Sequence, residues 1–86
     1  MKIGFRKSFI KQYASLNLKQ RGLVDFALKL FEADPDNPKL KNHALKGRLK
    51  GYRAVYAAFD LRVIFRVEGN YVYVEIVAVG SHNQVY

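Results

Sequence analysis

The residues best suited to acid–base chemistry lie in the second half of the chain. The sequence contains two histidines, His43 and His82, and an imidazole titrates near pH 6.5, so it can take up or release a proton at neutral pH. Asp60 begins a predicted strand beside Arg62, and Tyr86 follows His82 by four residues. Three separate stretches of chain therefore carry groups that can transfer protons or stabilise negative charge.

Each of these residues also has an ordinary structural explanation. A histidine in the basic segment around position 43 is most often a surface loop residue, and Asp60 is a common turn former. Arg62 could be a solvated charge or the partner of Glu75, and Tyr86 could pin its end of the chain by burying its ring. No single residue indicates catalysis.

Familiar metal and cofactor motifs are absent from the sequence. It has no glycine-rich phosphate loop, no histidine pair at zinc-ligand spacing and no Gly-x-Ser-x-Gly motif. Its seven acidic residues are scattered and form no evident carboxylate cluster for Mg²⁺. If the protein is an enzyme, we expect it to use neither a metal ion nor an organic cofactor.

The charge of the chain favours a polyanionic partner. Fifteen Lys and Arg stand against seven Asp and Glu, a net charge of +8, and every basic residue except Arg62 and Arg66 lies at or before Arg53. Such a field attracts nucleic acid or an acidic protein. The alternative is a basic surface that does no more than face water.

Length and composition predict one small domain over residues 1–86. Half of the residues are hydrophobic, which is enough for one modest core. The absence of cysteine suits a reducing compartment. No apolar stretch approaches the roughly 20 residues that cross a bilayer, and the basic first residues lack the apolar core of a secretory signal. We therefore expect a cytoplasmic protein without a membrane partner.

The first half of the chain shows one short strand and two helices. Lys2–Phe5 is a candidate strand, and Ser8 is placed to cap a first helix that carries Phe9 and Tyr13 one turn apart. A capping box at Asn17 and Gln20 predicts a second helix, Leu18–Ala33, which prolines 35 and 38 terminate. Its apolar residues repeat at helical spacing: Leu23, Phe26, Ala27, Leu30 and Phe31.

The second half changes to the two-residue period of strands. Arg53–Ala58, Leu61–Glu68 and Tyr71–Val79 are rich in Val, Ile, Tyr and Phe, and Gly69–Asn70 predicts a hairpin turn. The basic connector Lys39–Gly51, with two Leu-Lys-Gly triplets, indicates a turn and a short edge strand. The pattern predicts an α+β fold, with two N-terminal helices packed on a twisted antiparallel sheet.

Strict alternation assigns the faces of the last two strands. The residues expected on the apolar face of the earlier strand are Leu61, Val63, Phe65 and Val67. Those expected to share one face of the later strand are Val72, Val74, Ile76 and Ala78.

Taken together, the second half resembles the RelE/ParE superfamily of bacterial toxin–antitoxin proteins, in particular its YafQ-like, messenger-RNA-cleaving branch. The resemblance rests on the stretches NHALKGRLKGYRAVYAAFDLRVIFRV and VAVGSHNQVY, which cover about half of the chain. Their shared steps are His-x-Leu-Lys-Gly, Gly-Tyr-Arg, an Asp-led strand, and Gly-Ser-His with a closing aromatic residue. The resemblance implies the same fold and an endoribonuclease that acts on messenger RNA, often on the ribosome.

The resemblance also implies a set of site residues by matching position. Catalytic or substrate-contacting roles fall on His43, Asp60, Arg62, His82 and Tyr86. Phosphate contacts are expected from the basic residues Lys46, Arg48, Lys50 and Arg53. Because the sequence offers two histidines and several arginines but no metal cluster, our hypothesis is metal-independent transesterification by the ribose 2′-hydroxyl, with one histidine as acid and the other as base in an order that the sequence leaves open.

Two positions depart from the YafQ-like pattern. Tyr56 stands where that branch has a further histidine, and a phenol loses its proton only near pH 10, so it is a poor proton carrier at neutral pH. Leu61 stands where the branch has a tryptophan, and it cannot stack as an indole does. Activity that differs in rate or selectivity is the expected consequence.

Two other functions are compatible with the same sequence. ParE-like relatives share the fold but poison DNA gyrase, and a basic RNA- or ribosome-binding domain needs no catalytic residue. The resemblance further implies a cognate antitoxin with an acidic or amphipathic segment, and contact with operator DNA only through the antitoxin complex.

Overall fold

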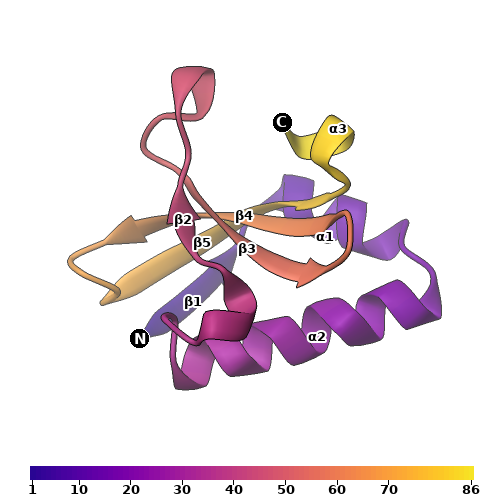
Figure 1. The fold of residues 1–86 in the computed structure, drawn as a ribbon, viewed down its shortest axis with the longest axis horizontal. Helices are drawn as coiled ribbons and strands as arrows, with labels where there is room; N and C mark the ends of the chain where they lie inside the picture. The colour runs from indigo at the N-terminus through magenta and orange to yellow at the C-terminus, as the bar shows by residue number, and fades with distance from the viewer.

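A five-stranded sheet forms the framework of the molecule (Figure 1). The computed structural model describes all residues, 1–86. In spatial order the strands are β1 (Lys2–Phe5), β5 (Tyr73–Gly80), β4 (Leu61–Glu68), β3 (Arg53–Ala58) and β2 (His43–Ala44). The predicted α+β fold is confirmed. The sheet is mixed rather than wholly antiparallel, because β1 pairs in parallel with β5, the strand farthest from it in sequence.

Helix α1 (Lys7–Ala14) packs against β5 and buries Phe9, whose ring stacks on Tyr13 at 5.7 Å between centroids. The predicted cap at Ser8 is wrong. Arg6 is the N-cap residue and makes no side-chain capping bond. The Ser8 hydroxyl instead donates to the carbonyl oxygen of Val77 at 2.6 Å, because the start of α1 lies against β5.

Helix α2 (Leu18–Ala33) has the predicted bounds, and both bonds of the Asn17–Gln20 capping box are formed. The helix is rotated about its axis relative to the prediction, so a partly different set of residues is buried. Val24, Ala27 and Phe31 enter the core, whereas Phe26 is 59% exposed. Phe26 flanks a shallow groove beside Leu40, since the sheet meets the helix along the stripe that begins at Val24.

Strands β3 and β4 have the predicted bounds, but β5 begins two residues later than expected. The turn extends to residue 72, with positive φ angles at Gly69, Asn70 and Tyr71. A bulge where β4 passes from Ile64 to Phe65 shifts the alternation of β5. Val79 therefore joins Val74 and Ile76 in the core, and the expectation that Ala78 shares their face is wrong.

The connector holds the predicted short edge strand, although β2 precedes the Leu-Lys-Gly triplets. Two 3₁₀ helices flank it, η1 (Pro38–Leu40) and η2 (Gly47–Leu49). A short helix that we did not predict, α3 (His82–Val85), follows β5. None of the helices combines the length and the apolar character that crossing a membrane requires.

The core predicts a sharp contrast between two phenylalanines of α2. Phe31 is 1% exposed, and its ring meets Phe65 edge-on at 4.8 Å. We expect Phe31→Ala to lower the free energy of unfolding by about 3–5 kcal/mol. Phe26→Ala on the same helix should change it by less than about 1 kcal/mol. Urea unfolding of both variants checks this, and equal losses would contradict the observed helix orientation.

Candidate active site

The predicted site residues gather on the sheet face that α1 and α2 do not cover, here called the outer face. Residues paired across neighbouring strands share a face. One such row runs from His43 through Ala54 and Ile64, and the next joins Tyr56 to Arg62. The pairing therefore places His43 and Arg62 on the same face, in adjacent rows.

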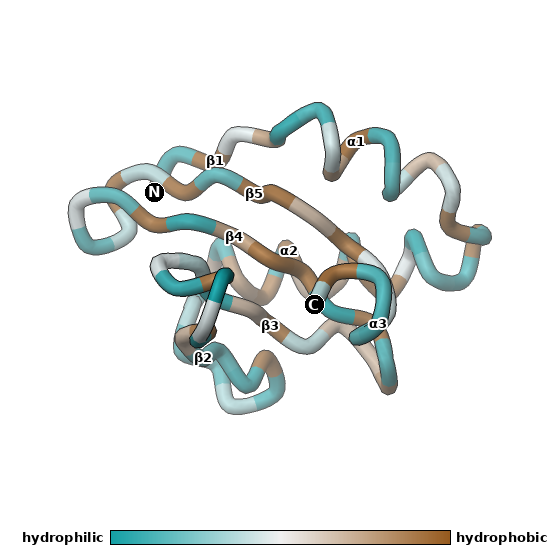
Figure 2. Tube along the Cα trace, turned by 90° about the horizontal axis from the view of Figure 1, so that it is seen from above, coloured by the Kyte–Doolittle hydropathy of each residue, from teal (hydrophilic) through white to brown (hydrophobic).

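Two segments rise above this face and enclose its centre. In Figure 1 the loop after β2 and helix α3 stand on the side of the sheet opposite α2. Figure 2 looks onto the outer face and shows the loop near β2 and β3, and α3 near the ends of β4 and β5. Ile64, on this face of β4, is only 2% exposed although it lies outside the main core.

Helix α3 is held directly on the sheet. A Cβ atom on Gly80 would lie 2.8 Å from Oε1 and 3.2 Å from Cβ of Gln84, and 3.3 Å from Cγ1 of Val85, so a larger residue at position 80 would require these side chains of α3 to shift. Asp60, in the turn between β3 and β4, accepts a hydrogen bond from the backbone N–H of His82 at 3.0 Å. Asp60 thus holds the main chain of α3 rather than an imidazole nitrogen.

The last residues of the chain, 81–86, here called the tail, bring two of the predicted catalytic side chains together. His82 and Tyr86 lie one helical turn apart, and their rings meet edge-on with centroids 4.4 Å apart. Arg48, from the loop after β2, donates to the main-chain oxygen of Tyr86 at 2.6 Å. The loop and the tail therefore meet above the sheet, and Arg48 joins them.

Arg62 lies beside a tyrosine that carries a second cation. Its guanidinium carbon is 5.2 Å from the centroid of the Tyr56 ring, and Nζ of Lys41 is 5.0 Å from the same ring. Nη1 of Arg62 is buried without a hydrogen-bond partner, as is the hydroxyl of Tyr86. An unpartnered buried donor is costly, and an anion placed there would satisfy it.

His43 lies at the far edge of the outer face. Its Nδ1 is 2.8 Å from the carbonyl oxygen of Lys41. Because a carbonyl can only accept, Nδ1 must carry the proton, which leaves Nε2 unprotonated in the neutral ring. His43 lies on the edge strand β2 and His82 on α3, and no hydrogen bond or ring contact joins the two histidines.

The remaining predicted phosphate-binding residues divide between the two faces. Lys46 and Lys50 are exposed on the loop after β2 and form no ion pair. Arg53 faces the helix-covered side, where Nε donates to Asn42 at 2.9 Å. The structure therefore does not bring Arg53 to the outer face.

Charge on the outer face is uneven along the sheet. Residues 39–53 include no acidic residue, and Lys41, Lys46 and Lys50 among them form no ion pair. At the other end Glu75 accepts from Arg6 at 2.8 Å and from Arg66 at 3.4 Å, and Arg66 also binds Glu68 at 2.6 Å. The hydrogen bond from Arg6 lowers the pKa of the Glu75 carboxyl, and Arg66 adds to this effect. Unneutralised positive charge is thus concentrated around Arg62.

Sequence reasoning did not assign Lys41 and Tyr56 to the site. The strand register could have indicated Tyr56, which lies directly opposite Arg62, whereas the placement of Lys41 depends on a left-handed backbone conformation (φ 49°).

Leu61 is 5% exposed and belongs to the core, so its position offers no surface to a base. No group of three or more His, Cys, Asp or Glu side chains is arranged to hold a metal ion.

Comparison with known proteins gives one family match and several similar structures. Residues 1–86 match the family model of the YafQ toxin, described as a bacterial toxin of a type II toxin–antitoxin system. None of the curated proteins matches the chain.

The solved structures share the fold at low sequence identity. YafQ from E. coli strain BL21(DE3) is 19% identical, with a TM-score of 0.80 over 99% of this chain and 97% of that one. A metal-bound toxin from Helicobacter pylori is 27% identical, with a TM-score of 0.71 over 100% and 99%. A chain of the E. coli DinJ–YafQ toxin–antitoxin complex is 18% identical, with a TM-score of 0.69 over 99% and 96%.

The Asp60 contact predicts the stability of α3. Asp60→Gly suits the positive φ angle of 54° but removes the acceptor, whereas Asp60→Asn keeps an oxygen at the same place. Losing a cap of this kind costs about 1 kcal/mol, so we expect amide hydrogen exchange in α3 to become about five- to tenfold faster in Asp60→Gly alone. Equal exchange in both variants would show that α3 is held by other contacts.

Proposed function

Because the chain belongs to the YafQ family of bacterial type II toxins, we propose that it is an endoribonuclease that cleaves messenger RNA by metal-independent transesterification. The resemblance noted in the sequence is thereby confirmed over residues 1–86. The observation that carries the proposed chemistry is the buried, unpartnered Nη1 of Arg62, on the same sheet face as His43 and on the strand next to the one that leads into α3.

The reaction begins with attack of a ribose 2′-oxygen on the adjacent phosphorus. A base takes the proton of the 2′-hydroxyl, the bond from phosphorus to the 5′-oxygen breaks, and an acid protonates that oxygen. The products are a cyclic phosphate on one fragment and a 5′-hydroxyl on the other. The attacking and leaving oxygens lie on opposite sides of the phosphorus, so the acid and the base must also stand on opposite sides.

We assign the two histidines to these two positions because they come from separate elements beside the outer face. His43 lies on the edge strand β2, and His82 lies on α3, whose first N–H is bonded to Asp60. Nε2 of His43, free when Nδ1 is bonded to Lys41, is the atom suited to accept or return a proton. We take His82 as the leading acid–base residue and His43 as its counterpart, each contributing about 10²–10⁴-fold.

Arg62 stabilises the charge that develops on the phosphate. A phosphate oxygen beside Nη1 would give this donor the partner that it lacks within the protein. The nearby Lys41 adds a second positive charge across the Tyr56 ring. Stabilisation of this kind acts most strongly as the phosphorane gains negative charge.

The aromatic and basic surroundings bind the rest of the RNA. Tyr86, held edge-on to His82, provides a ring on which an unpaired base can stack. Lys46 and Lys50 extend the positive surface along the loop after β2. Arg48, which donates to the main-chain oxygen of Tyr86, lies where this surface meets the tail. Phosphate contacts of this kind make binding weaken steeply with salt.

A toxin of this family requires control by an antitoxin. The E. coli YafQ structure with DinJ is a toxin–antitoxin complex, and we propose that this chain likewise binds a cognate antitoxin. An acidic segment laid on the cations around Arg62 would both speed association and exclude RNA. Message bound to the ribosome is the proposed target in the absence of the antitoxin.

His82 supplies the most direct test of catalysis. The His82→Ala protein should keep its fold, because the imidazole is exposed and the Asp60 bond uses the main chain. Cleavage of messenger RNA should fall by about 10²–10⁴-fold, as measured by mapping message ends after induction. Growth arrest with undiminished cleavage would refute the assignment, and DNA breaks without loss of message would favour a gyrase poison.

Arg62 has a matched control on the same strand and face. Arg62→Ala should lower the cleavage rate by about 10²–10³-fold while RNA affinity falls much less. Arg66→Ala removes the same charge from an arginine already paired with Glu68 and Glu75, and it should cleave at nearly the parent rate. Equal losses in single-turnover assays of both variants would reduce Arg62 to a general surface charge.

A further inference from the structure

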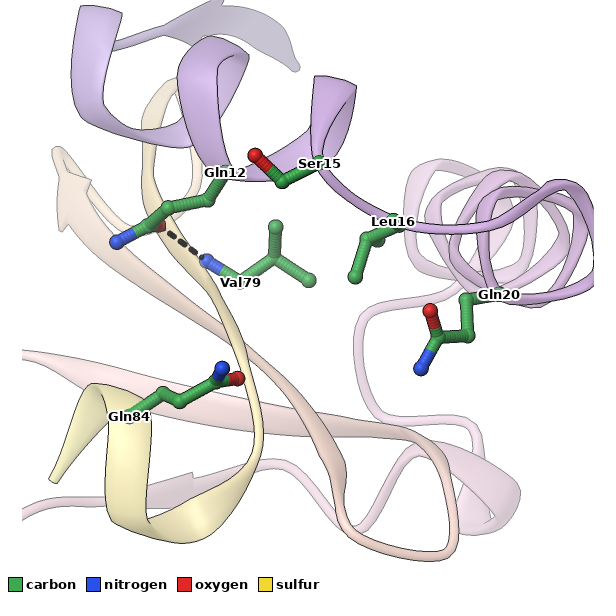
Figure 3. Close-up of a pocket in the computed structure, with 6 residues that line it drawn as sticks. All are labelled: Gln12, Ser15, Leu16, Gln20, Val79 and Gln84. Atoms are coloured by element: carbon green, nitrogen blue, oxygen red, sulfur yellow. Dashed lines mark hydrogen bonds between the residues drawn. The ribbon is translucent and has the colours of Figure 1, made fainter.

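A separate pocket of about 350 Å³ lies between α1, the start of α2, the end of β5 and α3. Its lining residues are Gln12, Ser15, Leu16, Gln20, Val79 and Gln84 (Figure 3). None of them is charged, and they include all three glutamines of the chain. In Figure 3 the side chains of Gln20 and Gln84 extend toward each other from α2 and α3, next to the apolar side chains of Leu16 and Val79.

The oxygen of every glutamine is already engaged by a main-chain donor. Oε1 of Gln12 accepts from Val79 at 2.9 Å, that of Gln20 from Asn17 at 3.0 Å, and that of Gln84 from Ser81 at 2.8 Å. A main-chain N–H can donate to the oxygen of a side-chain amide but not to its NH₂ group. These bonds therefore fix which end of each amide is the oxygen and which is the NH₂ group.

The fixed amides leave an unusual set of free groups. None of the three amide NH₂ groups has a partner within the protein, so the pocket offers uncharged donors beside an apolar surface. A ligand that suits it presents carbonyl oxygens on a flat, largely apolar body.

We propose that this pocket binds a keto base, guanine or uracil, of the RNA next to the cleaved phosphate; this inference rests on the proposed function. Guanine and uracil carry a carbonyl oxygen where adenine and cytosine carry an NH₂ group. The usual pairing of an amide with adenine uses the amide oxygen as well as its nitrogen. Each oxygen here already accepts one main-chain hydrogen bond, so the groups left without any partner are the NH₂ donors, which pair with a carbonyl oxygen and not with the exocyclic NH₂ group of adenine or cytosine.

The position of the pocket connects it with the active site through α3. Successive residues of a helix are about 100° apart, so Gln84 projects from the side of α3 opposite His82 and Tyr86. The pocket therefore lies about one helix width, roughly 10 Å, from the paired rings. A strand whose phosphate lies at Arg62 can place a neighbouring base across α3 in this pocket.

The test uses substitutions that keep the protein contacts of the glutamines. Gln20→Glu and Gln84→Glu retain an oxygen for the capping bonds, because glutamate serves the capping box as glutamine does. Both remove the NH₂ donors and place a negative charge against the carbonyl oxygen of the base. Asn83→Asp is the matched control, since it makes the same charge change on α3 at an exposed residue outside the pocket.

Binding is measured without cleavage, by following the glutamine side-chain NH₂ signals in nuclear magnetic resonance titrations. The probes are the four nucleoside monophosphates. We expect guanosine and uridine monophosphates to shift these signals, and to bind about tenfold more weakly to Gln20→Glu and Gln84→Glu but unchanged to Asn83→Asp. The inference is overturned if adenosine and cytidine monophosphates bind equally well, if no nucleotide moves the signals, or if only antitoxin binding responds to the substitutions.

A cleavage assay separates this inference from the proposed function. On short RNAs that differ in the base beside the cut, the parent should favour a keto base, and Gln84→Glu should lose that preference. If the parent cleaves no RNA yet its glutamine signals respond to keto nucleotides, the proposed function fails and the pocket assignment stands. Base selectivity that survives both substitutions would reject the pocket assignment while leaving the nuclease intact.

Discussion

The close packing of α3 on the end of β5 is the constraint on which the outer face depends. Gly80 has no side chain, so the short helix lies against the strand with Gln84 and Val85 at distances that a Cβ atom at position 80 would make too tight without a shift. The bond from the His82 N–H to Asp60 then fixes where the helix begins. With α3 elsewhere, His82 and Tyr86 would not stand beside the strand that carries Arg62, and the loop after β2 would lose the contact that Arg48 makes. A helix of four residues has little stability alone, so these few contacts determine the geometry of the site.

The distribution of charge makes this geometry useful for binding a polyanion. Ion pairs around Glu75 neutralise Arg6 and Arg66 at one end of the outer face. At the other end Arg62 and Lys41 meet only the ring of Tyr56. A partially shielded cation with an unused donor attracts a phosphate more strongly than a solvated surface lysine, because less water must be displaced and less side-chain freedom is lost.

Local signals in the sequence were sufficient for much of the fold. The bounds of α2 follow from a capping box and two prolines, and the β4–β5 hairpin follows from its glycine turn. The bulge after Ile64 was not predictable, since it depends on how β4 and β5 pair, and neither was the parallel pairing of β1. The family pattern pointed to His82 and Tyr86 but not to the short helix that brings their rings together, and the side chain of Arg53 turns to Asn42 because of the strand register. The glutamine-lined pocket needs three elements in place before its residues become neighbours.

The central claim is that the outer face cleaves RNA through the ribose 2′-hydroxyl without a metal ion. The most direct measurement is the chemical identity of the RNA ends produced by the purified toxin in the presence of a strong metal chelator. The mechanism requires a cyclic phosphate on the upstream fragment and a 5′-hydroxyl on the downstream fragment, formed at an undiminished rate. A 3′-hydroxyl with a 5′-phosphate, or the loss of cleavage on chelation, would contradict it.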